Sequence, residues 1–238
     1  MRVAVISDIH GNCLALEAVL ADIETQGADL TLNLGDMVSG PLAPARTADL
    51  LIECDFPSVA GNHEHYLIAN AGLGRVDSFV RAALTPEQLD WIAGLPDTLA
   101  INGELFLCHG TPKDAVTPWL DNWMEERSFT LPGQASVTAA AEGVDLPVLL
   151  CGHTHVPHTV RLGDGRLVVN PGSVGVQMNY GSPDARYAIV ERRNGRWSVS
   201  FRAVPYDWAA AAGQACSNGF PHWREVLTGG WAAASGLF

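Results

Sequence analysis

The chain has 238 residues, of which 47% are hydrophobic and 17% charged, and its formal net charge at pH 7 is −12. This composition excludes a disordered chain, and the length suits one well-cored domain, so we expect a single domain over residues 1–238. The 14 Lys and Arg residues are too few and too scattered to neutralise a nucleic-acid backbone, so stable nucleic-acid binding is not expected. Small phosphorylated substrates remain compatible with the charge, because bound cations can make a site in an acidic protein locally positive.

The cysteines and the N-terminal residues indicate a reducing compartment. Five cysteines form no C-x-x-C pair and no even disulfide framework, and we interpret them as buried, reduced thiols. The apolar run Val3 to Ile6 is too short for a signal peptide. No run of about 18 uncharged apolar residues predicts a membrane span. We therefore expect a cytoplasmic protein that does not associate with membranes.

The first 60 residues alternate between strand and helix patterns. Residues 3–6 predict a strand, apolar positions at helical spacing from 14 to 23 predict a helix, and residues 30–34, 46–53 and 58–60 then predict strand, helix and strand. This alternation favours parallel strands joined by right-handed crossovers.

Helices and hairpins follow one another in the rest of the chain. Thr85 and Pro86 predict a helix that begins at Pro86 and ends near Gly94. Turn residues predict three hairpins, which join 98–101 to 104–108, 156–162 to 166–170, and 187–191 to 197–204. Further patterns predict a helix over 134–142, a strand over 147–151 and a C-terminal helical extension over 205–238, with one helix near 223–227. Residues 111–133 are expected to form an excursion over the active-site face, where substrate choice would be made.

Side chains that can bind metals follow five predicted strands at their carboxyl ends. They are Asp8 and His10, then Asp36, then Asn62 and His63, then His109, and finally His153 and His155. Because open α/β sheets bind their ligands at this edge, we expect these side chains to meet.

The chemistry of this set predicts a dinuclear metal site. Asp, Asn and His without thiolates suit Mn, Fe, Zn, Ni or Co and are unlike a structural zinc site. The set is too large for one ion with open positions, but it fits two ions that share a carboxylate. We therefore expect two divalent transition-metal ions, with manganese as the first choice. Each short motif alone has a simpler interpretation, such as a helix cap at Asn62, which does not explain all of them together.

These segments resemble the motifs of the calcineurin-like metallophosphoesterase superfamily, which are D-x-H, G-D, G-N-H-[DE], a later H and G-H-x-H. The resemblance covers residues 3 to about 193, and the stretch from Asn170 to Gly175 is similar to one in small bacterial and archaeal phosphodiesterases of that superfamily. It implies an α/β fold, a four-layer α/β/β/α sandwich of two mixed sheets flanked by helices.

The resemblance also implies a role for each candidate residue. Asp8, His10 and His155 would bind one metal ion, Asn62, His109 and His153 the other, and Asp36 would bridge the two. His63 would be catalytic rather than a ligand, placed to contact the phosphate or to protonate the leaving oxygen.

One departure from the superfamily argues against a protein phosphatase. Protein Ser/Thr phosphatases continue their second motif as G-D-x-x-D-R-G, where the Asp orients the catalytic His and the Arg binds phosphate, whereas residues 35–40 contain neither partner. Glu64 and His65 are then candidates for orienting His63, with solvated loop residues as the equally weighted alternative. Lys113 and Arg186 are candidates for contacting phosphate.

The predicted activity is metal-dependent phosphodiester hydrolysis of a small phosphorylated substrate. A water that bridges two cations becomes a hydroxide nucleophile near neutral pH and can attack phosphorus in line. One alternative is a pyrophosphatase that acts on dinucleoside polyphosphates or other nucleotides. Another, from a different class, is a metal-stabilised interaction scaffold, against which the complete ligand set and His63 favour an enzyme.

Overall fold

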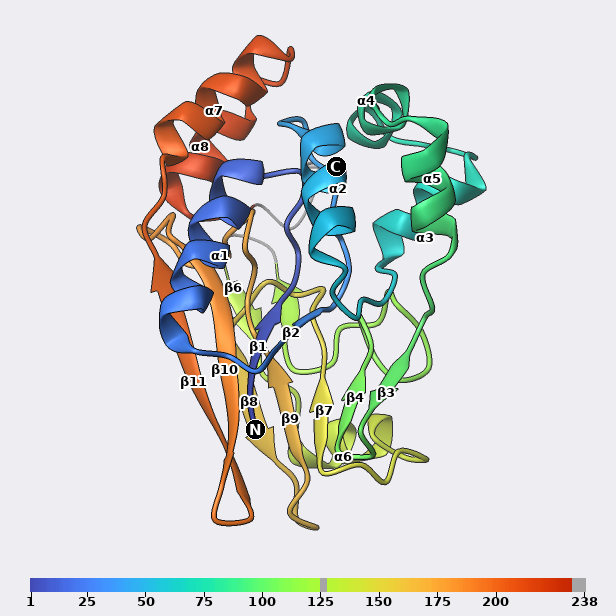
Figure 1. The fold of residues 1–238 in the computed structure, drawn as a ribbon, viewed down its shortest axis with the longest axis vertical. Helices are drawn as coiled ribbons and strands as arrows, with labels where there is room; N and C mark the ends of the chain where they lie inside the picture. Colours follow the sequence, from blue (N-terminus) through green and yellow to red (C-terminus); the bar gives the residue numbers. More distant parts are fainter. Residues whose placement is uncertain (125–127, 233–238) are drawn as a thin grey trace.

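Two mixed sheets form the centre of the molecule (Figure 1). The computed structural model of the chain describes residues 1–124 and 128–232. The first sheet has the order β11-β10-β1-β2, formed by Arg196–Val204, Ala185–Arg193, Arg2–Ile6 and Leu30–Asn33. The second has the order β3-β4-β7-β9-β8, formed by Leu99–Ile101, Leu105–Leu107, Val148–Leu150, Leu167–Asn170 and His158–Arg161. In the first sheet β1 pairs parallel with β2 and antiparallel with β10. In the second, β7 pairs parallel with β4 and β9, and β8 pairs antiparallel with β9.

Alternating side chains on the strands separate three cores, because successive residues of a strand point to opposite faces. Val3 and Val5 of β1 belong to a core between the two sheets, together with Leu150 of β7. Ala4 and Ile6 of the same strand belong to the core that the first sheet shares with helices. The third core lies on the outer face of the second sheet. The predicted order of layers, helix, sheet, sheet and helix, is confirmed.

Most helices cover the first sheet or gather above its edge. They are α1 (Cys13–Gln26), α2 (Pro44–Cys54), α3 (Asn62–Ala69), α4 (Arg75–Ala83), α5 (Pro86–Ala93), α7 (Trp208–Ser217) and α8 (Trp223–Gly229). The short α6 (Gln134–Ala140) instead places Val137 in the core of the second sheet. In Figure 1, α3, α4 and α5 form a group on the side away from α7 and α8.

Local sequence accounts for where α5 begins and ends. Thr85 accepts a hydrogen bond from the Gln88 amide, the Gln88 side chain accepts one from the Thr85 amide, and Pro86 occupies the first turn. These contacts satisfy amide groups that have no partner within the helix. The helix ends before Gly94, as the sequence predicts.

The structure differs from the sequence prediction in four places. Helices α3 and α4 occupy a stretch for which the sequence predicts no helix, and the 111–133 excursion contains a small hairpin of β5 (Asn122–Met124) and β6 (Ser128–Thr130). Residues 125–127 of that excursion lie outside the described residues. The strand predicted over 58–60 is a single parallel bridge between Asn33 and Ser58. All five cysteines are free, but Cys54 and Cys216 are only partly buried.

The C-terminal extension joins the helical layer. Helix α7 packs against α8 and α1, and Trp223 of α8 is fully buried in the same core as Ile6. Residues 233–238 of the predicted extension lie outside the described residues. The single domain over 1–238 stays a prediction.

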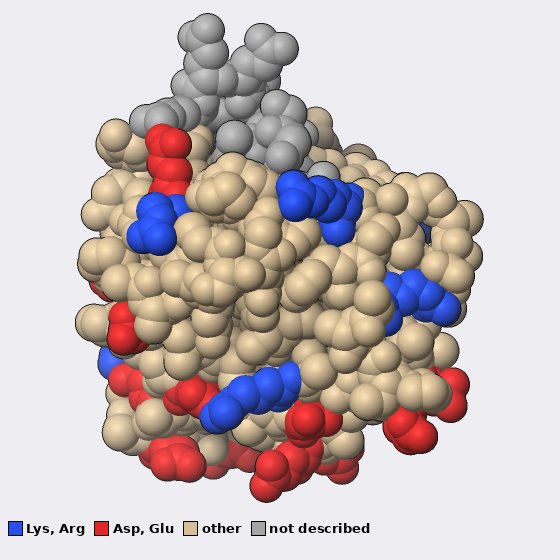
Figure 2. All heavy atoms as spheres, turned by 90° about the horizontal axis from the view of Figure 1, so that it is seen from above, with Lys and Arg blue, Asp and Glu red and all other residues tan. Residues whose placement is uncertain are grey.

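The surface offers no continuous basic stripe on the face shown in Figure 2, where Lys and Arg side chains lie apart from one another and acidic side chains gather along one edge. Such a face does not provide the clustered cations that a nucleic-acid backbone requires. Across residues 1–124 and 128–232, none of the helices combines the length and apolar character needed to span a membrane.

Candidate metal centre

The eight side chains singled out in the sequence meet in one buried cluster at the carboxyl ends of the strands. Asp8 and His10 follow β1 and Asp36 follows β2, while Asn62 and His63 form the first turn of α3; His109 follows β4, and His153 and His155 follow β7. Every one of them is buried, with at most 9% of its surface exposed.

Two groups of ligand atoms lie on either side of Asp36. Atoms of Asp8, His10 and His155 lie within 4.8 Å of one another, and so do atoms of Asp36, His109 and His153. The Asp36 carboxylate also lies 3.9 Å from His10 Nε2 and 3.2 Å from His109 Nε2, so it touches both groups. Atoms of His10, Asp36 and His63 form a third such group, and the assignment of individual residues to two cations stays a prediction.

Three histidines are held with the same ring nitrogen facing inward. The Nδ1 atoms of His10, His109 and His155 lie 2.7–2.8 Å from the backbone carbonyl oxygens of Ser39, Leu34 and Val176, respectively. Because a carbonyl oxygen only accepts, each Nδ1 donates, and the Nε2 lone pair of the neutral ring is left for another partner. The Nε2 atoms of His10 and His155 face each other at 3.1 Å. A cation bound by both nitrogens would remove the repulsion between these lone pairs.

Orphaned polar atoms provide an independent test of whether the cluster fits cations. Within residues 1–124 and 128–232, Asp8 Oδ1, Asn62 Oδ1 and His109 Nε2 are buried and take part in no hydrogen bond, although Asp8 Oδ1 lies 3.4 Å from His155 Nε2 and His109 Nε2 lies 3.2 Å from Asp36. A buried polar atom without a partner costs about 1–3 kcal/mol. Metal coordination would satisfy all three, so the residues fit a site for divalent cations.

Burial and neighbouring charges place most of these groups in the protonation state of metal ligands. Burial and the nearby His155 lower the pKa of His10 to about 3, and burial and His109 lower that of His153 to about 4. Burial opposes ionisation of Asp36, but His109 and His63 hold the pKa of its carboxyl well below the usual value. Neutral imidazoles and an ionised carboxylate are the forms that coordinate a metal.

His109 is the exception in this set. Burial lowers its pKa, but the carboxylates of Asp36 and Asp8 prevail and raise it to about 10. A cation that binds here therefore displaces a proton from the His109 ring.

The ligand loops adopt a backbone conformation that side chains other than glycine rarely take. Asp8, His10, Asp36, His153 and His155 have φ values between 48° and 69°. Strained residues of this kind cost about 1–3 kcal/mol each and cluster at functional sites. The concentration of these strained residues in the cluster indicates that the fold tolerates backbone strain there to position their side chains.

The stretch from Asn170 to Gly175 supports the loop that carries Asp8. The Ser173 hydroxyl and the Gly175 amide both donate to the Asp8 carbonyl oxygen, at 2.7 and 3.0 Å. A Cβ at Gly175 would lie 1.8 Å from the Ile9 carbonyl oxygen, so only glycine fits there. The motif noticed in the sequence thus has a structural role, which is to hold the first ligand loop against the sheet.

Glu64 fastens two ligand loops together. Its buried carboxylate accepts from the amides of Gly61, Asp36 and Met37 at 2.7–2.9 Å. The alternative that Glu64 is a solvated loop residue is therefore wrong. Its hydrogen bonds join the turn before α3 to the loop after β2, which presents Asp36.

His63 is oriented by Asp77 of α4, a residue that the sequence does not single out. His63 Nδ1 lies 3.1 and 3.3 Å from the two Asp77 carboxylate oxygens. Glu64 is occupied by backbone amides, and His65 pairs with the exposed Asp97 at 3.2 Å, so neither of the two predicted candidates orients His63. Burial lowers the pKa of His63, but Asp36 and Asp77 outweigh it and raise the pKa above the usual value. No motif surrounds Asp77, and only the packing of α4 on α3 reveals it.

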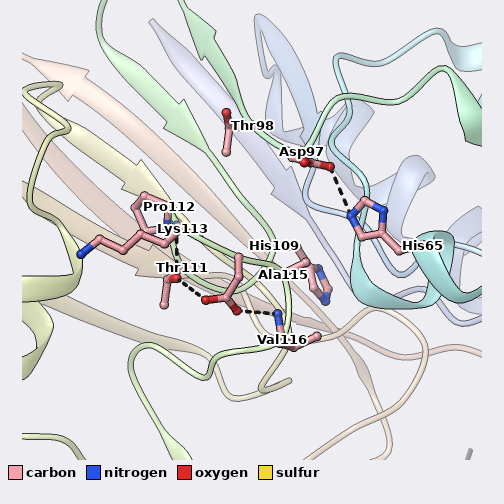
Figure 3. Close-up of a pocket in the computed structure, with 10 residues that line it drawn as sticks. His65, Asp97, Thr98, His109, Thr111, Pro112, Lys113, Ala115 and Val116 are labelled. Atoms are coloured by element: carbon pink, nitrogen blue, oxygen red, sulfur yellow. Dashed lines mark hydrogen bonds and ion pairs between the residues drawn. The ribbon is translucent and has the colours of Figure 1, made fainter.

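The 111–133 excursion borders the cluster at two points. Residues 111–116 line a pocket of about 540 Å³ that His109 also lines (Figure 3). Further along, the fully buried Asp121 accepts from the hydroxyl of Thr154, which lies between His153 and His155 in the chain, at 3.3 Å. Of the two candidate phosphate contacts, Lys113 lines the pocket, whereas the guanidinium of Arg186 donates to Ser182 at 2.5 Å.

Comparisons with known proteins agree with the fold. The family model of the calcineurin-like phosphoesterase superfamily domain matches residues 1–195. A crystal structure of a metallophosphoesterase from Sphaerobacter thermophilus is similar, with 28% identity and a TM-score of 0.78, over 97% of this chain and 99% of that one. A hypothetical protein from Pyrococcus horikoshii OT3 has the same fold, with 20% identity and a TM-score of 0.79, over 98% of this chain and 99% of that one.

A relative known from its sequence leads to the same family. An uncharacterized protein of Methanocaldococcus jannaschii is 26% identical over 245 residues, which cover 93% of this chain and 94% of that protein. With the matched family model and the shared fold, the chain belongs to the calcineurin-like phosphoesterase superfamily, whose members are metal-dependent hydrolases of phosphoesters.

Proposed function

We propose that this protein hydrolyses phosphodiester bonds of a small phosphorylated substrate with the help of two divalent metal ions. The observation that carries the proposal is the convergence of eight buried side chains on one cluster, in which Asp8 Oδ1, Asn62 Oδ1 and His109 Nε2 have no hydrogen bond within the described part of the chain. When bound, the two cations supply a deprotonated water near neutral pH and offset the negative charge on the phosphoryl oxygens.

The side chains of the cluster have separate roles in this proposal. Asp8, His10 and His155 would hold one cation, Asn62, His109 and His153 would hold the other, and Asp36 would contact both; the proximity of the Asp8, His10 and His155 atoms and of the Asp36, His109 and His153 atoms supports this assignment. His63 stands at the edge of the cluster with its Nδ1 on Asp77, so its Nε2 is the atom that donates a proton to the leaving oxygen. Asp77 keeps the ring in this orientation, as a carboxylate does for a catalytic imidazole, and acts as a positioning residue.

Manganese is the first metal to test. Oxygen ligands from Asp and Asn combined with imidazole nitrogen suit manganese, and also iron, nickel, zinc or cobalt. The three histidines whose Nδ1 donates to a carbonyl have the support typical of metal ligands in proteins.

The test is hydrolysis of bis(p-nitrophenyl) phosphate by the protein loaded with manganese, compared with p-nitrophenyl phosphate, the matching monoester. We expect diester hydrolysis that disappears with a chelator and returns with the metal. Activity that survives complete metal removal, checked by elemental analysis, would refute the proposal. Full metal occupancy without hydrolysis of any diester would instead support the scaffold alternative.

A further inference from the structure

A pocket lies next to the metal centre. It measures about 540 Å³, within the range of small-molecule sites, and lies between α3, the residues that precede β3 and the 110–116 loop. His109 belongs both to the pocket and to the metal cluster, where its Nε2 lies 3.2 Å from Asp36. The pocket therefore adjoins the cluster through His109.

The charges around the pocket disfavour a second phosphate. Asp97 and Asp114 both line it and bring carboxylates, and the Asp97 carboxylate lies 3.2 Å from His65. Lys113 is the one lysine or arginine in the lining, and Figure 3 shows its ammonium group pointing away from His65 and His109. A polyphosphate would thus place negative charge near two carboxylates without a cation that faces it.

The remaining lining suits a neutral group with hydroxyls and a ring. The Asp97 carboxylate, the His65 imidazole and the Thr98 hydroxyl can exchange hydrogen bonds with sugar hydroxyls. Val116, which is 52% exposed, and Pro112 also line the pocket and offer apolar surface. An exposed apolar side chain in a polar pocket is the expected partner for the face of a ring.

We propose that this pocket binds a neutral, nucleoside-sized substituent of the phosphodiester and does not accept a further phosphate. This inference rests on the proposed function, because it places the scissile phosphoryl group on the metal centre. It also favours a nucleoside phosphodiester over a dinucleoside polyphosphate as the substrate class.

The experiment is a binding measurement on the metal-loaded protein by calorimetry. The ligands are inorganic phosphate, which occupies only the centre, a nucleoside 5′-monophosphate, which adds the pocket group, and a nucleoside 5′-diphosphate. We expect the monophosphate to bind at least ~10-fold more tightly than phosphate, and the diphosphate to bind no more tightly than the monophosphate. Equal affinity for phosphate and monophosphate would overturn the inference, as would a clear preference for the diphosphate.

A pocket-filling variant locates the effect. Ala115→Trp introduces an indole into the pocket lining and should remove the advantage of the monophosphate over phosphate. Ala135→Trp is the matched control, because Ala135 lies on the exposed part of α6, and it should keep the advantage. Thr98→Val, which preserves side-chain shape, provides a second variant if Ala115→Trp does not fold, and should reduce the advantage severalfold. An advantage that persists undiminished in Ala115→Trp, or in Thr98→Val where only that variant folds, refutes the inference.

The two proposals fail separately. If the protein hydrolyses no diester but binds the monophosphate more tightly than phosphate, the proposed function fails and the pocket assignment stands. If it hydrolyses bis(p-nitrophenyl) phosphate but shows no monophosphate advantage, the pocket assignment fails and the proposed function stands.

Discussion

The metal centre and the neighbouring pocket share His109 but are built in opposite ways. Side chains of the centre are buried, those of Asp8, Asp36, His10, His109 and His155 are hydrogen-bonded to backbone, and five residues of the centre have left-handed backbone conformations. The pocket wall includes several exposed groups, and the side chains of His65 and Asp97, which form an ion pair with each other, are 48% and 78% exposed. Under the two proposals above, the fold fixes the groups for the chemistry, whereas the groups proposed to select the substrate can change at little cost to stability.

The largest effect should come from the residue between the two metal groups. Asp36→Asn removes the negative charge that both groups contact, so we expect loss of bound metal and a fall of about 10³-fold or more in diester hydrolysis. Elemental analysis and turnover measure the two effects. Asp97→Asn makes the same chemical change in the pocket wall and should retain the metal. Full metal content in the Asp36→Asn variant would contradict the proposed bridging role of Asp36.

The next largest effect should separate chemistry from metal binding. His63→Ala removes the proposed proton donor and leaves the ligands in place, so we expect a loss of roughly 10²–10⁴-fold in kcat with unchanged metal content. His222→Ala, an exposed histidine near α8, serves as the control. Turnover within a fewfold of the parent protein would show that His63 has no catalytic role.

Asp77→Asn should give a smaller effect with a signature in the pH profile. Asp77 contributes to the raised pKa of His63, so its neutral replacement lowers that pKa. A general acid works only while protonated, so activity is lost as the pH rises through its pKa, and the alkaline limb should move to lower pH. We expect kcat to fall roughly 10–100-fold, a range typical of residues that support a ligand or catalytic group. Asp90→Asn, on the exposed side of α5, should leave the limb in place. An unshifted limb in Asp77→Asn would argue that Asp77 only stabilises the fold.

Glu64→Gln tests the bracing of the centre. Gln has one acceptor oxygen for three backbone amides, so the loops around Gly61 and Asp36 lose part of their support. We expect metal affinity to fall about tenfold, measured by competition with a chelator of known affinity. Glu87→Gln, at an exposed position of α5, is the matched control. Unchanged affinity would show that the loops hold their geometry without the carboxylate.

The smallest effect is expected in the pocket wall. His65→Ala removes one hydrogen-bonding group, so KM for a nucleoside diester should rise roughly fivefold, as expected for about 1 kcal/mol. The change should be smaller for methyl p-nitrophenyl phosphate, which lacks a nucleoside. An equal change for both substrates would mean that His65 acts on the centre itself, and the contrast between the two regions would break down.

Sequence was sufficient for the sheets and for the side chains that follow strands. Asp8 and Asp36 follow β1 and β2 of the first sheet and His109 follows β4 of the second, so their places at the carboxyl ends of strands follow from the apolar runs, whereas the meeting of the two sheets does not. The same reasoning fails for Asp77, which reaches His63 only because α4 packs on α3. Periodicity carries no signal for such a contact between helices.

Competing hydrogen bonds explain the other differences. Glu64 looks like an ordinary polar residue, because its partners Asp36 and Met37 are 28 and 27 residues away. The strand predicted over 58–60 is reduced to one bridge, since the Ala60 amide donates to the Pro96 carbonyl instead of extending the ladder to β2. Both outcomes depend on where distant backbone comes to lie, which local patterns do not encode.

The support of the Asp8 loop by Ser173 and Gly175 has a consequence for biosynthesis. The Ser173 contact joins residues 165 positions apart, and the contact between His10 and His155 joins residues 145 positions apart. Closing such long loops is slow and costs entropy before any contact compensates for it. A chain emerging from the ribosome therefore has no complete cluster until residues beyond Val176 have been translated, so the metal binding proposed for it would be one of the last events of its maturation.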